Sequence, residues 1–396
     1  MHKLAIDGGK PVRDNKIAYG RQSVDNEDIE AVIKVLKGDY LTTGPYVEEF
    51  EEKVAQYVGA KYAVAVSNGT AGLHMACYAA GLKEGDEVIV SSLTFAASSN
   101  AVLYCGATPV FADIDPVTYN IDPADVEKKI TDKTKAIIPV DFTGQSVDMD
   151  KLKSIADKHG LIIIEDAAHA LGSEYKGNKV GKQADMVMFS FHPVKPITTA
   201  EGGMVTTNNE EFYNKMKRFR SHGIERNPDY MVESHGPWYY EQLELGYNYR
   251  LTDVQSALGT SQMNKLEQFV NRRREIVASY NDKFKDLDEI ITPYEAEYSN
   301  SGWHLYIIQL KPESLNATRK EIFEALTAEN IGVNVHYLPV YLHPYYRELG
   351  YKAGSCPHAE YLYENMITLP LYPTMSEKDV DDVVDAVNKV ISHYRK

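Results

Sequence analysis

The stretch Ile162-Ile163-Ile164-Glu165-Asp166-Ala167-Ala168-His169 decides the fold class of this chain. Residues 161–164 are apolar and a carboxylate soon follows them, which is typical of a buried strand that ends at a cleft. The same pattern recurs, because short apolar runs alternate with helical stretches through the first half of the chain. These runs are 62–66, 87–90, 109–111, 136–140, 161–164, 186–191 and 204–206.

The alternation predicts an α/β fold in which a mainly parallel, seven-stranded sheet lies between helices. Ligands of such sheets bind beyond the carboxyl ends of the strands. Residues 1–265 are expected to form this large domain together with an N-terminal arm, and residues 266–396 a smaller α+β domain. An unbroken helical tract from residue 252 to about 287 is expected to connect them, and a strand is expected at 303–310.

Composition narrows the class of protein. The chain has 396 residues, of which 43% are hydrophobic, and a formal net charge of −15, which argues against a general nucleic-acid binder. No apolar stretch is long enough for a membrane span or a signal peptide. The three cysteines, Cys77, Cys105 and Cys356, are odd in number and widely spaced. This spacing favours a protein of a reducing compartment, with no disulfide framework and no zinc site. We therefore expect a cytoplasmic protein.

Two residues suggest the chemistry. Asp166 ends one apolar run, and Lys195 follows another. After Lys195 comes a stretch rich in small residues, Thr198-Thr199-Ala200-Glu201-Gly202-Gly203, which is expected to form a tight loop. A desolvated amine that forms a Schiff base with an aldehyde, next to an acid that keeps a pyridine nitrogen protonated, is what pyridoxal 5'-phosphate (PLP) requires. Taken alone, Asp166 is an ordinary strand-ending acid and Lys195 a solvated loop lysine. The combination favours PLP.

A phosphate site is expected where Ser67-Asn68-Gly69-Thr70-Ala71-Gly72 leads from a strand into a helix. By itself this stretch also fits a plain helix N-cap. Ser190 could add a hydroxyl to the same phosphate. Phe95 could stack on a planar cofactor and His169 could hydrogen-bond near its ring, although a core Phe and a surface His are the commoner cases.

These motifs, in this order, resemble the DegT/DnrJ/EryC/StrS sugar aminotransferases, which have the fold-type I PLP architecture. The resemblance covers essentially the whole chain. It rests on the pieces already quoted and on four further ones: Gly8-Gly9-Lys10-Pro11-Val12, Leu41-Thr42-Thr43-Gly44-Pro45, Gly246-Tyr247-Asn248-Tyr249-Arg250-Leu251-Thr252-Asp253 and Val335-His336-Tyr337.

The resemblance implies roles for individual residues. Lys195 holds PLP and shuttles the proton, Asp166 pairs with the pyridine nitrogen, and His169 lies near the ring hydroxyl. Phe95 and Ala168 cover the two faces of the ring. The phosphate is expected at Gly69, Thr70, Ala71 and Ser190, with Asn248 reaching it from the neighbouring subunit of a homodimer with shared active sites. Residues expected to border the substrate are Thr42, Thr43, Arg250, His336 and Tyr337.

Finer resemblance points to the pseudaminic acid branch of the family, through the runs 170–175, 195–203 and 219–223. It implies transfer of the amino group of L-glutamate to the C4 ketone of a UDP-linked 4-keto-6-deoxy-N-acetylhexosamine. Two alternatives stay open. One is another nucleotide ketosugar, aminated at C3 or C4 and linked to UDP or dTDP. The other is a PLP-binding regulatory protein without turnover. A sugar 3-dehydratase is disfavoured, because that branch carries histidine where this chain has Lys195.

Overall fold

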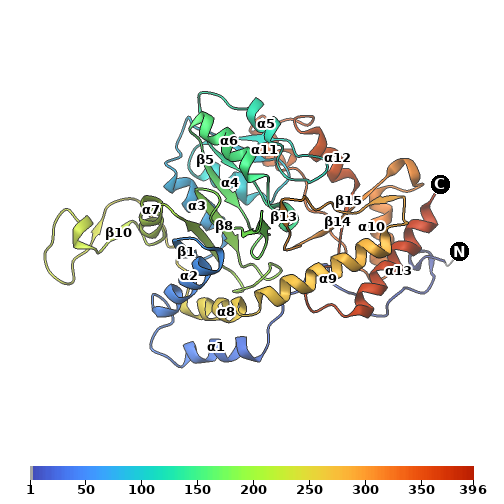
Figure 1. Cartoon of the computed structure of the whole chain (residues 1–396), viewed down its shortest axis with the longest axis horizontal. Helices are drawn as coiled ribbons and strands as arrows, with labels where there is room; N and C mark the ends of the chain where they lie inside the picture. The colour runs from blue at the N-terminus through green and yellow to red at the C-terminus, as the bar shows by residue number, and fades with distance from the viewer. Residues whose placement is uncertain (1–2) are drawn as a thin grey trace.

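A computed structural model describes residues 3–396 and shows a large sheet with its helices (Figure 1). Seven strands lie in the order β1 (Tyr62–Val66), β9 (Gly203–Thr207), β8 (Met186–Ser190), β5 (Ile162–Asp166), β4 (Thr134–Ile138), β2 (Glu87–Ser91) and β3 (Thr108–Ala112). Strand β9 runs antiparallel to both of its neighbours, and the other pairs are parallel. The expected α/β fold with a mainly parallel seven-stranded sheet is confirmed.

Alternation along the strands builds a core on each face of the sheet. In β1, Ala63 and Ala65 belong to one core, and Val64 and Val66 to the other, as a side-chain period of two requires. The first core is covered by α2 (Pro45–Val58), α6 (Met149–His159) and α8 (Asp253–Met263). The second is covered by α3 (Gly69–Ala79), α4 (Ala97–Tyr104) and α7 (Glu210–Arg220).

A smaller sheet of order β12 (Ile290–Ile291), β14 (Tyr306–Leu310) and β15 (Met366–Leu369) forms the C-terminal part. Helices α9 (Leu266–Phe284), α10 (Arg319–Ala328) and α13 (Glu377–Tyr394) pack around it. The beginning of the N-terminal arm joins the same core through Leu4 and Ile17. Figure 1 accordingly shows the two chain ends close together, beside α13. The domain boundary at residue 265 stays a prediction.

Two expectations about elements need correction. The tract from residue 252 is broken into α8 and α9 at Asn264 and Lys265. The Lys265 ammonium lies 3.0 Å from the Asp28 carboxylate of α1 (Asn26–Leu36) and also pairs with Asp25, contacts that periodicity cannot reveal. The strand expected at 303–310 begins only at Tyr306, because Trp303 has a left-handed φ of 48°.

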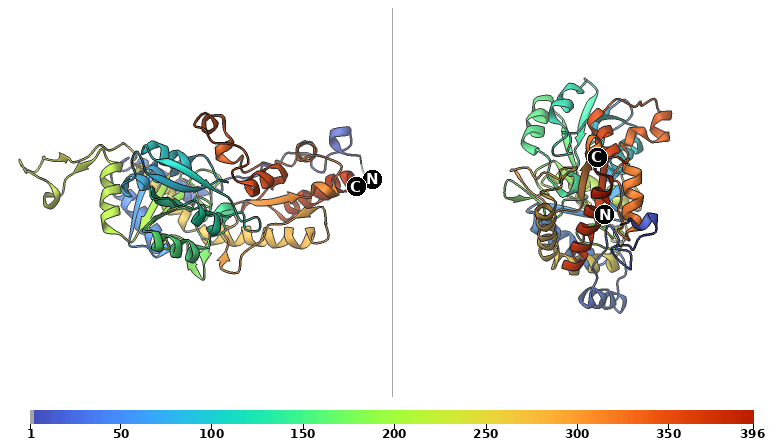
Figure 2. Two further views of the ribbon diagram at one scale, coloured as in Figure 1. Left: turned by 90° about the horizontal axis from the view of Figure 1, so that it is seen from above. Right: turned by 90° about the vertical axis from the view of Figure 1, so that its right-hand side faces the viewer.

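Between α7 and α8 the chain leaves the body of the molecule. The short strands β10 (Ile224–Glu225) and β11 (Glu241–Gln242) pair at the base of this excursion, which Figure 2 shows projecting away from the large sheet. Within residues 3–396, no helix combines the length and the apolar character that a membrane crossing demands.

Candidate active site

A cavity of about 830 Å³ opens at the carboxyl ends of β5 and β8, where the sheet meets the segment 334–337 of the C-terminal part. It brings together ten of the residues expected at the site: Gly69, Thr70, Phe95, Asp166, Ala168, His169, Ser190, Lys195, His336 and Tyr337. The position agrees with the rule that ligands of α/β sheets bind beyond the strand ends.

Asp166 is the last residue of β5 and is buried. Ser98 donates its hydroxyl to Oδ2 at 2.6 Å, and the amide of Ala168 donates to Oδ1 at 3.2 Å. Burial raises the pKa of the Asp166 carboxyl, while the Ser98 and Ala168 hydrogen bonds and the charge of Lys195 oppose that rise. Asp166 is thus a fixed carboxylate with two donors, suited to pair with a cationic ring nitrogen.

Lys195 extends into the same cavity from the loop after β8. Burial lowers the pKa of its amine to about 8, and the nearby Asp166 carboxylate limits the drop. The loop is folded back by Thr198, whose hydroxyl donates to the carbonyl of Phe191 at 3.1 Å, and by Ala200, whose φ of 65° is left-handed. A lowered pKa leaves part of the amine neutral near physiological pH, and only the neutral form attacks an aldehyde.

The start of α3 forms the expected anion site. Helix α3 begins at Gly69, so the amides of Gly69 and Thr70 lie in its first turn. A Cβ at Gly69 would lie 3.2 Å from Cβ of Ser190 and 3.4 Å from its hydroxyl oxygen, a tight contact, so glycine favours the close approach of the helix start to this hydroxyl. Ala71 does not line the cavity: its amide donates to Asn68 Oδ1 at 2.9 Å, and its phosphate role stays a prediction.

Rings close the cavity on its remaining sides. The Tyr337 hydroxyl lies 3.5 Å from His169 Nε2, and Phe95 lies at the edge with 62% of its surface exposed. Burial lowers the pKa of His336 to about 3, with a further contribution from Lys195. Burial likewise holds the pKa of His169 well below its ordinary value, so both imidazoles are neutral. An exposed aromatic ring at the edge of a cavity is available for stacking on a planar ligand.

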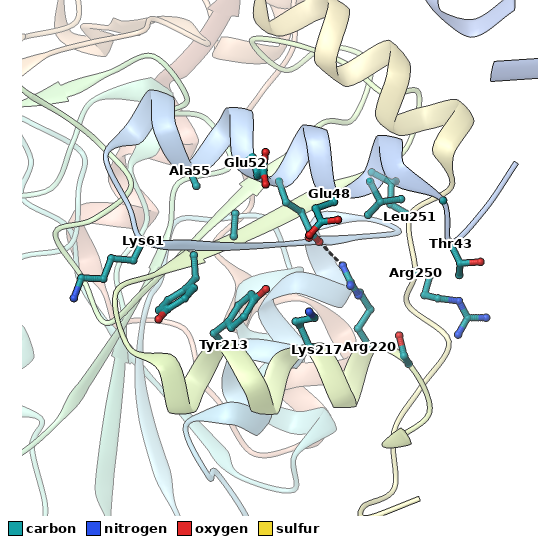
Figure 3. A pocket seen from close by; sticks show the side chains of 16 residues that line it. Thr43, Glu48, Glu52, Ala55, Lys61, Tyr213, Lys217, Arg220, Arg250 and Leu251 are labelled. Atoms are coloured by element: carbon teal, nitrogen blue, oxygen red, sulfur yellow. Dashed lines mark hydrogen bonds and ion pairs between the residues drawn. The ribbon is translucent and has the colours of Figure 1, made fainter. Parts of the chain in front are cut away.

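Four expected residues lie elsewhere in this chain. Thr43 and Arg250 line a second cavity of about 440 Å³ between α2 and α7, where Arg220 and Glu51 form an ion pair (Figure 3). Thr42 pairs with Thr252, and Asn248 with Ser221, through isolated β-bridges. The structure of one chain therefore does not bring Thr42, Thr43, Asn248 or Arg250 to Lys195.

The structure also adds residues that the sequence reasoning missed. Tyr19 of the N-terminal arm, His304 and Asn334 line the Lys195 cavity, and Ser98 of α4 contacts Asp166. The sequence analysis placed His304 inside the strand expected at 303–310, and therefore did not single it out as a residue of the site. Ser98 stands beside a second serine, Ser99, and nothing in the sequence separates their roles.

The residues present fit PLP. A buried acid, a desolvated lysine and free helix-start amides face one cavity, and the Nδ1 atom of His169 is buried with no hydrogen-bond partner among the described residues. Such an orphaned polar atom at a cavity wall is suited to a polar ligand. Asp166 would hold the pyridine nitrogen, Lys195 the aldehyde carbon, and Gly69, Thr70 and Ser190 the phosphate.

Comparison with known proteins supports this fit. The profile of the DegT/DnrJ/EryC1/StrS aminotransferase family matches residues 22–388. The chain is 42% identical to the Bacillus subtilis spore coat polysaccharide biosynthesis protein SpsC over 96% of this chain and 98% of the relative. It is 41% identical to the UDP-4-amino-4,6-dideoxy-N-acetyl-beta-L-altrosamine transaminase of Campylobacter jejuni, over 96% and 99%.

Solved structures agree with the sequence relatives. Helicobacter pylori PseC, an aminotransferase involved in the biosynthesis of pseudoaminic acid, superposes with a TM-score of 0.90 at 35% identity, covering 96% of this chain and 100% of that one. The PLP form of the putative sugar aminotransferase Spr1654 from Streptococcus pneumoniae has a TM-score of 0.89 at 32% identity, covering 96% and 99%. This chain therefore belongs to the DegT/DnrJ/EryC1/StrS aminotransferase family, and it is a PLP-dependent sugar aminotransferase of fold-type I.

Proposed function

We propose that this enzyme moves the amino group of L-glutamate to the C4 ketone of a UDP-linked 4-keto-6-deoxy-N-acetylhexosamine, as in pseudaminic acid biosynthesis. The observation that carries the proposal is that Lys195 and the buried Asp166 line one cavity, next to the helix-start amides of α3. The activities for which the Campylobacter and Helicobacter relatives are named support the choice of sugar.

Bound PLP supplies the electron sink that stabilises negative charge at the carbon losing its proton. The chain supplies the remaining functions. Lys195, with a pKa of about 8, accepts that proton and returns it, because its neutral and charged forms are both accessible near neutral pH. Asp166 keeps its charge opposite the ring nitrogen, and Ser98 holds it in place. Glutamate and the sugar react in turn at one site, so ping-pong kinetics are expected.

Substrate contacts divide between the two subunits in this proposal. His336 and Tyr337 line the cavity of their own chain. Asn248 and Arg250 lie away from it, and the segment 238–250 to which they belong exposes large apolar side chains, including Leu245 and Trp238. Exposed apolar groups are typical of contact surfaces, so we infer that this segment reaches a second copy, where Asn248 completes the phosphate site and Arg250, with Thr42 and Thr43, borders the sugar nucleotide. The enzyme is proposed to be a cytoplasmic homodimer.

A second candidate substrate is favoured by one finding. SpsC, named for spore coat polysaccharide, is as similar to this chain as the altrosamine transaminase is. A different nucleotide ketosugar, aminated at C3 or C4 and linked to UDP or dTDP, is therefore the alternative. The regulatory alternative is set aside, because the family and the named relatives are aminotransferases.

The test is incubation of the purified enzyme with glutamate and a panel of nucleotide ketosugars, with NMR identifying the aminated carbon. Amination at C4 of the UDP-linked 4-keto-6-deoxy-N-acetylhexosamine is expected. Lys195→Ala should abolish both the covalent visible-absorbing adduct with PLP and turnover, whereas Lys195→Arg should keep the charge and still be inactive. Preference for another sugar would select the alternative, and turnover by Lys195→Ala would refute the assignment of the amine.

A further inference from the structure

Helix α3, whose first turn offers the amides of the expected anion site, also contacts the segment that carries Asn248. His74 lies in the second turn of α3 and is 5% exposed. Its ring is surrounded by four aromatic rings at centroid distances of 5.1 to 5.9 Å, which belong to Tyr104, Phe219, Tyr247 and Tyr249. Helix α3 therefore contacts both sequence neighbours of Asn248.

A hydrogen bond joins His74 to this segment. The Tyr249 hydroxyl lies 3.1 Å from Nδ1 of His74. Burial lowers the pKa of His74 and raises the pKa of Tyr249, so the imidazole and the phenol are both neutral. A neutral imidazole has one N–H donor and one acceptor nitrogen, and a phenol can donate or accept. The pair therefore makes one hydrogen bond in either tautomer of the imidazole.

Backbone hydrogen bonds hold the same segment in an extended conformation. The amide of Tyr247 donates to the carbonyl of Phe219 at 2.8 Å, and that of Tyr249 donates to the carbonyl of Arg220 at 3.0 Å. The carbonyl of Tyr249 accepts from the amide of Ser67 at 2.8 Å. The segment is thus tied to the end of α7 and to the residue that follows β1.

Alternation of side chains places Asn248 on the opposite side of the segment from the aromatic rings. Successive side chains of an extended chain point to opposite faces. Tyr247 and Tyr249 share one face, where their rings stack 5.0 Å apart, with their planes 21° from parallel, beside His74. Asn248, between them, is exposed in the single chain. The two tyrosines therefore face α3, and Asn248 faces away from it.

One turn further along α3, Tyr78 adds contacts with the same region. Its ring stacks on Phe219 at a centroid distance of 4.1 Å, and its hydroxyl donates to Oε2 of Glu244 at 2.7 Å. Residues four apart lie on the same face of a helix, so His74 and Tyr78 form one surface. This surface of α3 holds the chain on both sides of Asn248.

We propose that His74 is a positioning residue for Asn248, and that it thereby acts on the active site of the second copy and not on the site of its own chain. The inference rests on the proposed function in one respect, namely that Asn248 reaches the phosphate in a second copy. His74 does not line the Lys195 cavity and acts through Tyr249. Without this hydrogen bond, Asn248 is no longer presented in one orientation.

Hydrogen–deuterium exchange in protein free of PLP is the first readout. His74→Phe keeps a ring but loses the hydrogen bond, and Tyr249→Phe removes only the partner hydroxyl. We expect both variants to exchange the amides of residues 246–250 about tenfold faster than the wild type, the size of one lost hydrogen bond. Tyr104→Phe, which removes a hydroxyl from another ring of the cluster, is the matched control and should exchange like the wild type. Wild-type exchange in His74→Phe and Tyr249→Phe would overturn the proposal.

Hybrid dimers test whether His74 acts on the other chain. Homodimers of His74→Phe should bind PLP about tenfold more weakly than the wild type. In a hybrid with Lys195→Ala, purified through a different tag on each chain, the site that keeps Lys195 receives Asn248 from the chain with an intact His74. Titration of the visible absorbance of the Lys195 adduct should therefore give wild-type PLP affinity for that site. Weak binding in the hybrid, equal to that of the His74→Phe homodimer, would show that His74 acts within its own chain and would refute the inference.

Failure of the proposed function gives a different result. If Asn248 does not reach a second copy, a hybrid of Lys195→Ala with Asn248→Ala will bind PLP as weakly as the Asn248→Ala homodimer. That outcome would remove the shared site and this inference together. Wild-type affinity in the Asn248→Ala hybrid but not in the His74→Phe hybrid would retain the shared site and remove only the role of His74.

Discussion

Asp166 and Lys195 line the same cavity and can carry opposite charges, and different surroundings set the pKa of each side chain. The carboxylate receives two hydrogen bonds, from Ser98 and the amide of Ala168. For Lys195, burial dominates and lowers the pKa of the amine to about 8. Because each hydrogen bond to the ionised form of a carboxyl lowers its pKa, Ser98 partly offsets the burial that favours protonated Asp166.

Ser98→Ala should therefore impair catalysis without altering the fold. Loss of a hydrogen bond to a charged group costs about 1.5–3 kcal/mol, so we expect kcat/KM to fall by roughly 10- to 100-fold. The pKa of Asp166 should rise further. Since the ionised carboxylate is the active form, the acid limb of the kcat/KM profile should move to higher pH.

Ser99→Ala is the matched control, because Ser99 is equally buried but its hydroxyl pairs with Tyr346 at 2.6 Å instead of with Asp166. Its pH profile should match that of the wild type. A profile of Ser98→Ala that coincides with that of Ser99→Ala would contradict the role assigned to Ser98.

At the scale of elements, the site depends on how closely β9 approaches the start of α3. Gly203 is the first residue of β9 and pairs with Val66 of β1. A Cβ at Gly203 would lie 2.8 Å from the backbone of Asn68 and from the amide nitrogen of Gly69. Backbone atoms cannot move aside as the end of a flexible side chain can. A larger residue at position 203 must therefore displace the start of α3.

Gly203→Ala should consequently weaken PLP binding more than it lowers stability. We expect the Kd for PLP to rise at least tenfold, which corresponds to about 1.4 kcal/mol, because the amides of Gly69 and Thr70 move away from the phosphate. Fluorescence titration of PLP and thermal unfolding measure the two effects separately.

Gly160→Ala provides the comparison. Gly160 caps α6 with a φ of 64°, and a Cβ there meets nothing within 4 Å. The substitution should cost stability, by about 1 kcal/mol for the left-handed backbone, and leave PLP affinity unchanged. Equal PLP affinity of both variants would show that the approach of β9 to α3 does not support the phosphate site.

For the molecule as a whole, the separation of Asn248 and Arg250 from the Lys195 cavity has one consequence. If these residues complete the site of a second copy, as proposed, then every active site needs both chains. Lys195→Ala and Asn248→Ala would each inactivate every site of their own homodimers. A hybrid of the two would contain one site with both residues intact.

Mixing the two inactive variants under conditions that exchange subunits should therefore restore activity. Random pairing makes half of the dimers hybrids with one intact site of two, so we expect about a quarter of the wild-type activity. Steady-state assays before and after mixing measure it, and mixing Lys195→Ala with itself is the control. No recovery, with exchange verified by mass spectrometry of the intact dimers, would contradict a shared site.

The large sheet and the chemical centre of the site can be predicted from the amino-acid order alone. An apolar run of strand length indicates that both faces of the strand are buried. The site residues, Asp166, Lys195 and the stretch 67–72, lie at or just after the ends of such runs. Their convergence on one cavity follows from the parallel order of the strands. The family resemblance covered the same residues and is confirmed.

Contacts between elements that are distant in the chain are visible only in the folded molecule. Ser98 on Asp166, His304 against His169, and Lys265 with Asp28 at the break between α8 and α9 each join segments that periodicity treats as independent. Hydrophobic patterns record which face of an element is buried, but not which polar partner it meets. That partner is fixed by packing the whole chain, where a buried polar group must find a hydrogen bond or bear the cost of burial without one.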